Sequence, residues 1–221
     1  MPFIHKYNVY NNTIAYLLDV DFLDNEDLFN YYYKISSTAR QKKTDNYKFQ
    51  SDKKLSLGVE ILLMEACNDF NVDYNKQCLI YGDNLKPYFK NSNIYFNLSH
   101  SGSKAMCVMS DFEVGCDIEK ISSCNSIIAD KFFTHEENLF LNKFSTESDG
   151  SKAFYRLWTL KESFLKCIGC GVSFPLDSFS ILFNEDNSIT VNQSISEYNF
   201  FFYEVECTLE YAMSICLRER I

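Results

Sequence analysis

Residues 154–171 read FYRLWTLKESFLKCIGCG, and this stretch predicts the helix around which the chain is organised. Placed on a helix at about 100° per residue, its large apolar side chains form one stripe, made of Phe154, Leu157, Trp158, Leu165 and Ile168. Lys161 lies in the middle of that stripe and Glu162 lies at its edge. A lysine on a buried face needs an anion nearby, either a bound phosphate, Glu162 or another carboxylate of the protein. The alternative is an amphipathic helix whose Lys161 side chain reaches past its neighbours to solvent.

Length and composition indicate a globular protein with ample material for an apolar core. The chain has 221 residues, of which 46% are hydrophobic and 16% aromatic, so one large domain or two small ones are possible. A net charge of −9 argues against nucleic-acid binding, which needs a basic surface. Residues 34–54 differ from the rest, because they hold seven Lys or Arg residues against two acidic ones. This basic segment favours a small anionic ligand, and a solvated helix face is the alternative.

The nine cysteines are interpreted as reduced thiols. No apolar run opens the chain, and no stretch approaches the ~18 uninterrupted apolar residues of a membrane span. We therefore expect a cytoplasmic protein without a membrane segment. Cys167 and Cys170 have the C-x-x-C spacing of a redox pair, but the chain lacks a second pair to complete a zinc site. We favour packing residues at a helix end, with Gly169 or Gly171 ending the helix.

Hydrophobic patterns elsewhere predict short strands and a few helices. Strands are expected at 13–20, 77–81, 94–98, 105–109, 114–121, 179–183, 189–191, 200–205 and 212–217, and further helices at 24–35, 51–70 and 134–144. Thr134 and Glu137 have the spacing of a capping box at the start of the last helix. Neither half of the chain shows the β-α-β alternation that requires a parallel sheet. We therefore expect an α+β fold of short antiparallel sheets with packed helices, in two halves.

Two acidic side chains lie on one face of the strand expected at 114–121. Asp117 and Glu119 are two residues apart, so they stand ~6.5–7 Å apart at the backbone, close enough for both to bind one cation. Glu162 on the central helix adds a third carboxylate. Such a set suits Mg²⁺, which binds a few carboxylates together with substrate phosphates and water. The same spacing is also common on solvated strand faces, which is the alternative.

Cationic and polar groups that could bind an anion occur near these carboxylates in the pattern. Lys161 and Lys166 flank Glu162 on the helix and would neutralise phosphate oxygens. Ser99 and His100 end a strand just before Gly102, and they offer a hydroxyl, an imidazole and turn amides. Taken singly, His100 is equally typical of a surface or capping histidine.

Four motifs occur in a fixed order along the chain. They are FNLSHSG at 96–102, GCDIE at 115–119, FF at 132–133 followed by Glu136, and WTLKESFLK at 158–166. In residues, order and spacing they resemble the Sfp-type 4′-phosphopantetheinyl transferases. The likeness is close from Phe96 to about Phe183. It is looser in the N-terminal half, where residues 54–58 and the pair Lys86-Pro87 resemble family landmarks.

The resemblance implies a pseudo-dimeric α+β fold with halves at residues 1–111 and 112–221 and coenzyme A in the cleft between them. It implies a Mg²⁺-dependent enzyme that transfers the phosphopantetheine arm from coenzyme A to a serine of an acyl or peptidyl carrier protein, releasing adenosine 3′,5′-bisphosphate. A monomer is expected, because one chain holds both halves of the site. The carrier would dock on residues 121–144, where the apolar candidates, which could equally pack inward, are Ile127, Ile128, Phe132 and Phe133.

Site roles follow from the resemblance by position. Asp117, Glu119 and Glu162 would hold Mg²⁺, and Glu162 would also accept the proton of the carrier serine. Lys161 and Lys166 would bind the pyrophosphate and stabilise the leaving phosphate. Ser99 and His100 would bind the nucleotide's phosphates, and Lys42 and Lys54 the 3′-phosphate and adenine end. Lys86, in the Lys-Pro landmark, would also bind coenzyme A.

The chain departs from the family at two landmarks. Leu85 precedes Lys86 where the family usually has Gly, which puts the turn there in doubt, and Lys54 replaces the usual Arg with a point charge. The alignment of the basic residues from Arg40 to Lys43 is open. Two alternative functions are a non-catalytic module that binds coenzyme A or a carrier, and another Mg²⁺-dependent phosphoryl transferase. The first predicts loss of a site residue, and the second would have to work without a Walker-type glycine loop.

Overall fold

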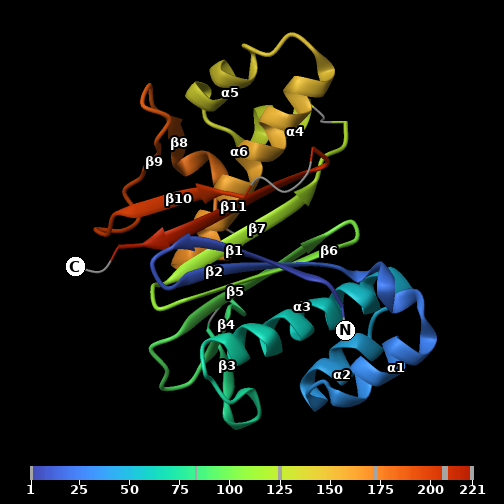
Figure 1. Cartoon of the computed structure of the whole chain (residues 1–221). Coiled ribbons are helices and arrows are strands. Elements are labelled where there is room, and N and C mark those ends of the chain that lie inside the picture. Colours follow the sequence, from blue (N-terminus) through green and yellow to red (C-terminus); the bar gives the residue numbers. More distant parts are fainter. Residues whose placement is uncertain (1, 83, 124–125, 172–173, 206–208, 220–221) are drawn as a thin grey trace.

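Two antiparallel sheets lie face to face, and a long helix covers the outer side of each, so the molecule has four layers (Figure 1). The computed structural model describes residues 2–82, 84–123, 126–171, 174–205 and 209–219, without the side chains of residues 126 and 127. Helix α3 (Gln50–Asp69) packs on the first sheet, and helix α6 (Glu147–Ile168) packs on the second.

The first sheet has the strand order β1-β2-β6-β5. Its strands are β1 (Ile4–Tyr10), β2 (Thr13–Asp19), β5 (Tyr95–Ser101) and β6 (Lys104–Ser110). Side chains of β2 and β6 alternate between the α3 face and the face toward the second sheet. The α3 face holds Tyr16, Leu18, Cys107 and Met109, and the other face holds Ala15, Leu17, Met106 and Val108. Burial on both faces explains why β2 and β6 have near-continuous apolar sequences.

The second sheet has the order β10-β11-β7, with β7 (Val114–Lys120), β10 (Phe200–Glu204) and β11 (Tyr211–Arg218). Val114, Cys116 and Ile118 face the first sheet, which leaves Gly115 on the side toward α6. A Cβ atom at Gly115 would lie 2.1 Å from the Ser163 carbonyl oxygen and 2.3 Å from the Cys167 nitrogen. Glycine therefore lets the backbones of β7 and α6 touch, which brings the acidic strand directly under the helix.

Smaller elements complete both halves of the chain. They are η1 (Val20–Asp24), α1 (Glu26–Ile35), α2 (Thr38–Asp45), η2 (Tyr74–Lys76), β3 (Leu79–Tyr81), β4 (Pro87–Phe89), α4 (Ser126–Phe132), α5 (His135–Leu141), η3 (Leu176–Ser178), β8 (Ser180–Phe183) and β9 (Ile189–Asn192). The central helix ends as predicted at Gly169, which takes a left-handed φ of 74°. Cys167 and Cys170 carry free thiols at this helix end.

The predicted α+β fold of antiparallel sheets with packed helices is confirmed. Strand β6 ends at Ser110 and β7 begins at Val114, so the expected division after residue 111 falls in this turn. We propose that the chain on each side of it forms one half, each with a sheet and a long outer helix. In the part of the chain that the structure describes, no helix combines the length and the hydropathy needed to span a membrane.

Candidate active site

A seam of side-chain contacts joins β5, at the edge of the first sheet, to β7, at the edge of the second. Asn97, Ser99 and Ser101 alternate along β5 and all three point to β7. Asn97 Oδ1 accepts a hydrogen bond from the Cys116 N–H at 2.9 Å, and Ser101 Oγ accepts one from the Lys120 N–H at 3.0 Å. These side chains satisfy backbone donors on the outer edge of β7. The seam therefore brings the SHSG motif beside the acidic strand.

Asp117 is the most enclosed carboxylate at the seam, with 3% of the residue exposed. Its Oδ1 accepts a hydrogen bond from Ser99 Oγ at 2.8 Å and another from Lys166 Nζ at 2.6 Å. Lys166 also donates to Ser99 Oγ at 3.0 Å, which closes a triangle of three residues from β5, β7 and α6. Burial lowers the pKa of Lys166, but the carboxylate of Asp117 opposes this and the net shift is upward. The ammonium of Lys166 is therefore charged at neutral pH.

Glu119 and Glu162 flank this triangle. Ser101 Oγ donates to Glu119 Oε2 at 2.7 Å, and Glu162 lies one helical turn before Lys166 on α6. Desolvation raises the pKa of Glu162 above its ordinary value, and the charge of Asp117 raises it further. Desolvation is also the first cause that raises the pKa of Glu119, again with a contribution from Asp117. The negative charge of Asp117 therefore disfavours the ionised forms of Glu119 and Glu162, and the positive charge of Lys166 favours them.

The donor set at the seam fits a divalent cation in charge and chemistry. Asp117 Oδ2 is buried and has no hydrogen-bond partner among the described residues, so one carboxylate oxygen is open. Three mutually repelling carboxylates would gain from a shared positive ion. In the described residues no three His, Cys, Asp or Glu side chains are grouped closely enough to hold a metal ion as they stand. The three predicted Mg²⁺ ligands are thus neighbours, and one of them has an open oxygen, but their side chains do not converge on a single metal position.

His100 ends the seam on the side of the basic segment. Its side chain keeps contact with solvent, yet desolvation is the main cause that lowers its pKa, followed by the charges of Lys166 and Lys43. Arg40 adds to the same effect. The charges of Lys43 and Arg40 on helix α2 thus act on the His100 imidazole, which favours these two residues in the open alignment. Lys42, the residue predicted for this place, is exposed on the same helix.

Lys54 and Lys86 form ion pairs and hydrogen bonds within the protein. Lys54 Nζ lies 2.9 Å from Asp24 Oδ1 and 3.2 Å from Asp21 Oδ1, beside η1. Lys86 Nζ donates at 3.0 Å to the carbonyl oxygens of Val114 and Cys167. Its charge therefore lies at the start of β7 and at the C-terminal end of α6, where a helix favours cations.

A pocket of about 240 Å³ opens beside the C-terminal half of α6, and it is lined by Asn84, Leu85, Lys86, Pro87, Asn97, Leu98, Glu162, Leu165, Lys166, Gly169 and Gly171. Leu85 has a φ of 61°, the left-handed conformation that glycine adopts freely. The turn nevertheless forms, because Gly82 N–H binds the Lys86 carbonyl at 3.1 Å and Leu85 N–H binds the Gly82 carbonyl at 2.9 Å. The Lys-Pro turn therefore lies beside the pocket even though leucine stands where the family usually has glycine.

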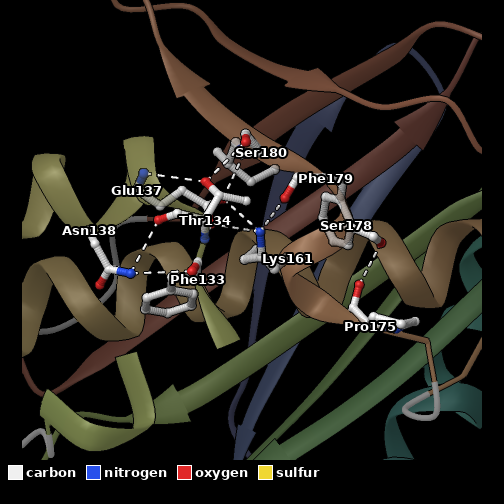
Figure 2. A network of polar contacts seen from close by, with 10 residues as sticks. Phe133, Thr134, Glu137, Asn138, Lys161, Pro175, Ser178, Phe179 and Ser180 are labelled. Carbon is white, nitrogen blue, oxygen red and sulfur yellow. Dashed lines mark hydrogen bonds and ion pairs between the residues drawn. The ribbon is translucent and has the colours of Figure 1, made fainter. Parts of the chain in front are cut away.

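Lys161 lies apart from the seam, in a buried polar network (Figure 2). Its Nζ donates to Glu137 Oε1 at 2.6 Å, to Glu137 Oε2 at 2.8 Å and to the Phe179 carbonyl at 2.7 Å. The side chains of Lys161 and Glu137 are both 0% exposed, and all three donors of the ammonium are engaged. The expectation that Lys161 contacts a phosphate is therefore wrong. The anion that its burial requires is another carboxylate of the protein, one of the alternatives that the sequence left open.

Glu137 is the site-related residue that the sequence identified only in part. The predicted capping box of α5 is confirmed, with Glu137 Oε2 accepting from the Thr134 N–H at 2.9 Å. The same carboxylate accepts from the Ile181 N–H at 2.8 Å and pairs with Lys161 (Figure 2). It therefore joins α5, α6 and β8. From the sequence, the lysine on an apolar helix face indicated that an anion must lie nearby, but it did not identify Glu137 as that anion.

A family model and individual related proteins both match this chain, and both point to the same family. The model of the 4′-phosphopantetheinyl transferase superfamily matches residues 113–216. The 4′-phosphopantetheinyl transferase gsp of Aneurinibacillus migulanus is 32% identical over 189 residues, which cover 86% of this chain and 79% of that protein. The 4′-phosphopantetheinyl transferase Sfp of Bacillus subtilis is 34% identical over 122 residues, covering 55% of this chain and 54% of that protein.

Among solved structures, a holo-(acyl-carrier-protein) synthase from Bacillus anthracis, in complex with CoA (3′,5′-ADP), covers 48% of this chain and 95% of its own. At 13% identity and a TM-score of 0.43, this likeness is too weak to carry a conclusion. The relationship rests on the sequence matches: the gsp match extends over most of the chain, and the family model includes β7 and α6. The chain therefore belongs to the 4′-phosphopantetheinyl transferase superfamily.

Proposed function

We propose that the protein transfers the 4′-phosphopantetheine arm of coenzyme A to a serine hydroxyl of an apo acyl or peptidyl carrier protein, with Mg²⁺ as cofactor. The observation that carries this proposal is the cluster at the seam, where Asp117, Glu119, Glu162 and Lys166 meet beside a pocket. A non-catalytic binding module would not need all four of these groups. Family membership supports the same reaction.

The reaction replaces the phosphoanhydride bond of coenzyme A with a phosphoester bond to the serine. The serine oxygen forms a bond to the phosphorus next to the pantetheine arm, the bond from that phosphorus to the bridging oxygen breaks, and adenosine 3′,5′-bisphosphate leaves with the electron pair. Glu162 is proposed as the base that accepts the serine proton. Its raised pKa supports this, because a stronger base takes up a proton more readily.

Lys166 is proposed to stabilise the charge of the phosphates during transfer. Its ammonium is held at 2.6 Å from Asp117 Oδ1, so it is oriented before substrate arrives. Asp117, Glu119 and Glu162 would hold Mg²⁺, and the open Asp117 Oδ2 supports this assignment. The ion would supply positive charge to both phosphates.

The nucleotide end of coenzyme A is proposed to bind at His100 and the basic residues of α2. Lys43 and Arg40 join Ser99 and His100 in this proposal because their charges act on the imidazole. Lys42, which is exposed, would add long-range attraction. Lys54 would have to exchange Asp21 and Asp24 for a phosphate, and Lys86 would contribute through the pocket wall.

Carrier docking on residues 121–144 is supported for part of the expected surface. Ile128 on α4 is 39% exposed. Phe133 is buried, with its ring 5.2 Å from that of Phe154, so it packs inward. The side chain of Ile127 lies outside the described residues. We also propose a monomeric cytoplasmic enzyme that does not bind nucleic acid, in keeping with a net charge of −9 and with both sides of the seam in one chain.

Intact-mass measurement of an apo carrier protein tests the proposed function. The carrier is incubated with the protein, coenzyme A and Mg²⁺, and a parallel sample contains EDTA. We expect a gain of one phosphopantetheine that EDTA abolishes. A gain that persists in EDTA would contradict the metal, and no gain with several carrier types, although coenzyme A binds, would favour the non-catalytic module.

A further inference from the structure

Glu60 is a buried carboxylate on α3 that the proposed reaction does not use. The residue is 2% exposed, and it faces α2. Its Oε1 accepts a hydrogen bond from the Ser37 N–H at 2.6 Å, and its Oε2 accepts one from Arg40 Nε at 2.6 Å. Ser37 is the N-cap of α2, and its Oγ accepts from the Arg40 N–H at 3.2 Å. Glu60 therefore binds both the N-cap residue of α2 and the arginine on its first turn.

Helix α2 depends on such polar contacts for its position. Thr44 is its only buried residue, so the helix has little apolar surface with which to pack on α3. Thr44 Oγ1 and Ser56 Oγ are 3.0 Å apart, and Arg40 Nη1 donates to Ser56 Oγ at a longer 3.4 Å. The two short bonds to the charged Glu60 carboxylate are the strongest in this set.

The surroundings of Glu60 hold few groups that could replace it. Tyr74 is half-buried beside it, and its enclosed hydroxyl makes no well-formed hydrogen bond within the described residues, although it lies close to Glu60 and Ser37. Burial raises the pKa of Tyr74, and the charge of Glu60 raises it further. Removing the carboxylate would therefore take away the acceptor of the Ser37 N–H and of Arg40 Nε, and leave Arg40 only its longer bond to Ser56 among the described residues.

The position of α2 matters because it carries the cations that act on His100. Lys43 and Arg40 lie on this helix, and Lys166 at the seam is the third cation that acts on the same imidazole. A shift of α2 would move two charges relative to His100 and leave the seam itself unchanged. Such a shift would therefore weaken the binding of the ligand group that lies at His100 and leave the rest of the ligand's contacts as they are.

We infer that Glu60 is a positioning residue that fixes α2 so that Lys43 and Arg40 face the terminal phosphate of the nucleotide. The inference rests on the proposed function, in which that group is the 3′-phosphate of coenzyme A. Glu60 thereby sets how strongly the enzyme prefers coenzyme A to dephospho-coenzyme A, the same molecule without the 3′-phosphate. It does so through Arg40 and α2 and does not touch the substrate.

The test compares kcat and KM for both substrates in Glu60→Gln, with Glu65→Gln as the matched control. Glu65 is a partly exposed carboxylate on the same helix, bound to Lys6 on the strand β1. We expect the KM for coenzyme A to rise about tenfold in Glu60→Gln, which is what losing a hydrogen bond to a charged group commonly costs. The kcat, and the KM for dephospho-coenzyme A, should stay near the wild-type values, as should all constants of Glu65→Gln.

Equal losses with the two substrates, or a fall in kcat alone, would overturn the inference, because the effect would not depend on the 3′-phosphate. Glu60→Asp keeps the charge and shortens its reach, so it should give an intermediate preference and serves if Glu60→Gln does not fold. An unchanged preference in the folded variants would also overturn it. If the wild type transfers nothing, the proposed function fails, and calorimetric binding of adenosine 3′,5′-bisphosphate to the same variants still tests the role of Glu60.

Discussion

At the scale of single residues, the charge of His100 should respond to a bound anion. Desolvation and the neighbouring cations Lys166 and Lys43 lower its pKa, so the free imidazole is neutral near neutral pH. A phosphate bound beside it would favour the protonated imidazolium and raise that pKa. Binding should therefore be coupled to uptake of a proton between the lowered pKa of the free protein and the raised pKa of the complex.

We predict that coenzyme A binding takes up protons near neutral pH and that His100→Gln removes this uptake while weakening binding about tenfold. Titration calorimetry in two buffers of different ionisation enthalpy measures the proton number. His5→Gln, which changes an exposed histidine on β1, is the control and should behave as the wild type. Equal enthalpies in both buffers for the wild type would contradict a role of His100 at the phosphate.

Residue roles could be predicted from the sequence where they depend on local spacing. Asp117 and Glu119 share a face because every strand has a period of two, and the structure places both at the seam. The partner of Lys161 was not predictable, because Glu137 comes from another element and already had an explanation as a capping residue. Lys42 and Lys43 could not be separated, since only the position of α2 against β5 decides which one acts on His100.

At the scale of elements, the position of α6 decides whether Glu162 and Lys166 reach the acidic strand. Gly115 allows the backbones of β7 and α6 to touch, and the pair Lys161–Glu137 ties the helix to α5 and β8. Contact with β7 and the pair with Glu137 act on different sides of the helix. A change at Gly115 should therefore lower the rate of transfer, and a change at Lys161 should lower the stability of the protein.

Gly115→Ala is expected to abolish most transfer, because the added methyl would overlap backbone atoms of α6 that cannot rotate away. Displacing the helix by about 1 Å costs on the order of 10²-fold in rate. Initial transfer rates test this. Gly150→Ala is the control on the same helix: its Cβ would meet nothing within 4 Å, and the better helix former should raise stability by roughly 0.5–1 kcal/mol with normal activity. Normal transfer by Gly115→Ala would contradict the close packing.

Lys161→Met is expected to destabilise the protein by about 3–5 kcal/mol, because it leaves the buried carboxylate of Glu137 without its counter-charge. Urea denaturation measures the loss, and the double variant Lys161→Met, Glu137→Gln should recover much of it. Coenzyme A affinity of the folded fraction should stay near that of the wild type. A stable Lys161→Met protein with weakened coenzyme A binding would restore the phosphate role that the structure argues against.

Elements with a strong internal pattern were predicted well, and elements defined by their neighbours were missed. Strands β7 and β11 match their expected ranges to within a residue at each end. Helix α6 was predicted from the stretch 154–171 and begins seven residues earlier, at Glu147. Strand β1 was missed because its sequence, IHKYNVY, is mostly exposed and becomes a strand by pairing with β2. Helix α2 was missed because it is polar throughout and is held by Glu60.

For the whole molecule, the seam unites two sheets that come from different halves of the chain. The sheets pack through a shared apolar layer, while the polar side chains of the candidate site gather where β5 meets β7 and α6. The fold class could be predicted from the absence of β-α-β alternation together with the family motifs. The face-to-face arrangement of the sheets could not, because alternation in β2 and β6 is hidden by burial on both faces.

The central claim is that the carboxylates at the seam, with Glu162 as base, carry out the transfer. The most direct test is the single-turnover rate of transfer from coenzyme A to an apo carrier by Glu162→Gln, measured beside its thermal midpoint. Glu147→Gln, at the exposed start of the same helix, is the control. We predict a fall of about 10²–10⁴-fold for Glu162→Gln with folding retained, and a normal rate for Glu147→Gln. A folded Glu162→Gln protein that transfers at nearly the wild-type rate would contradict the account.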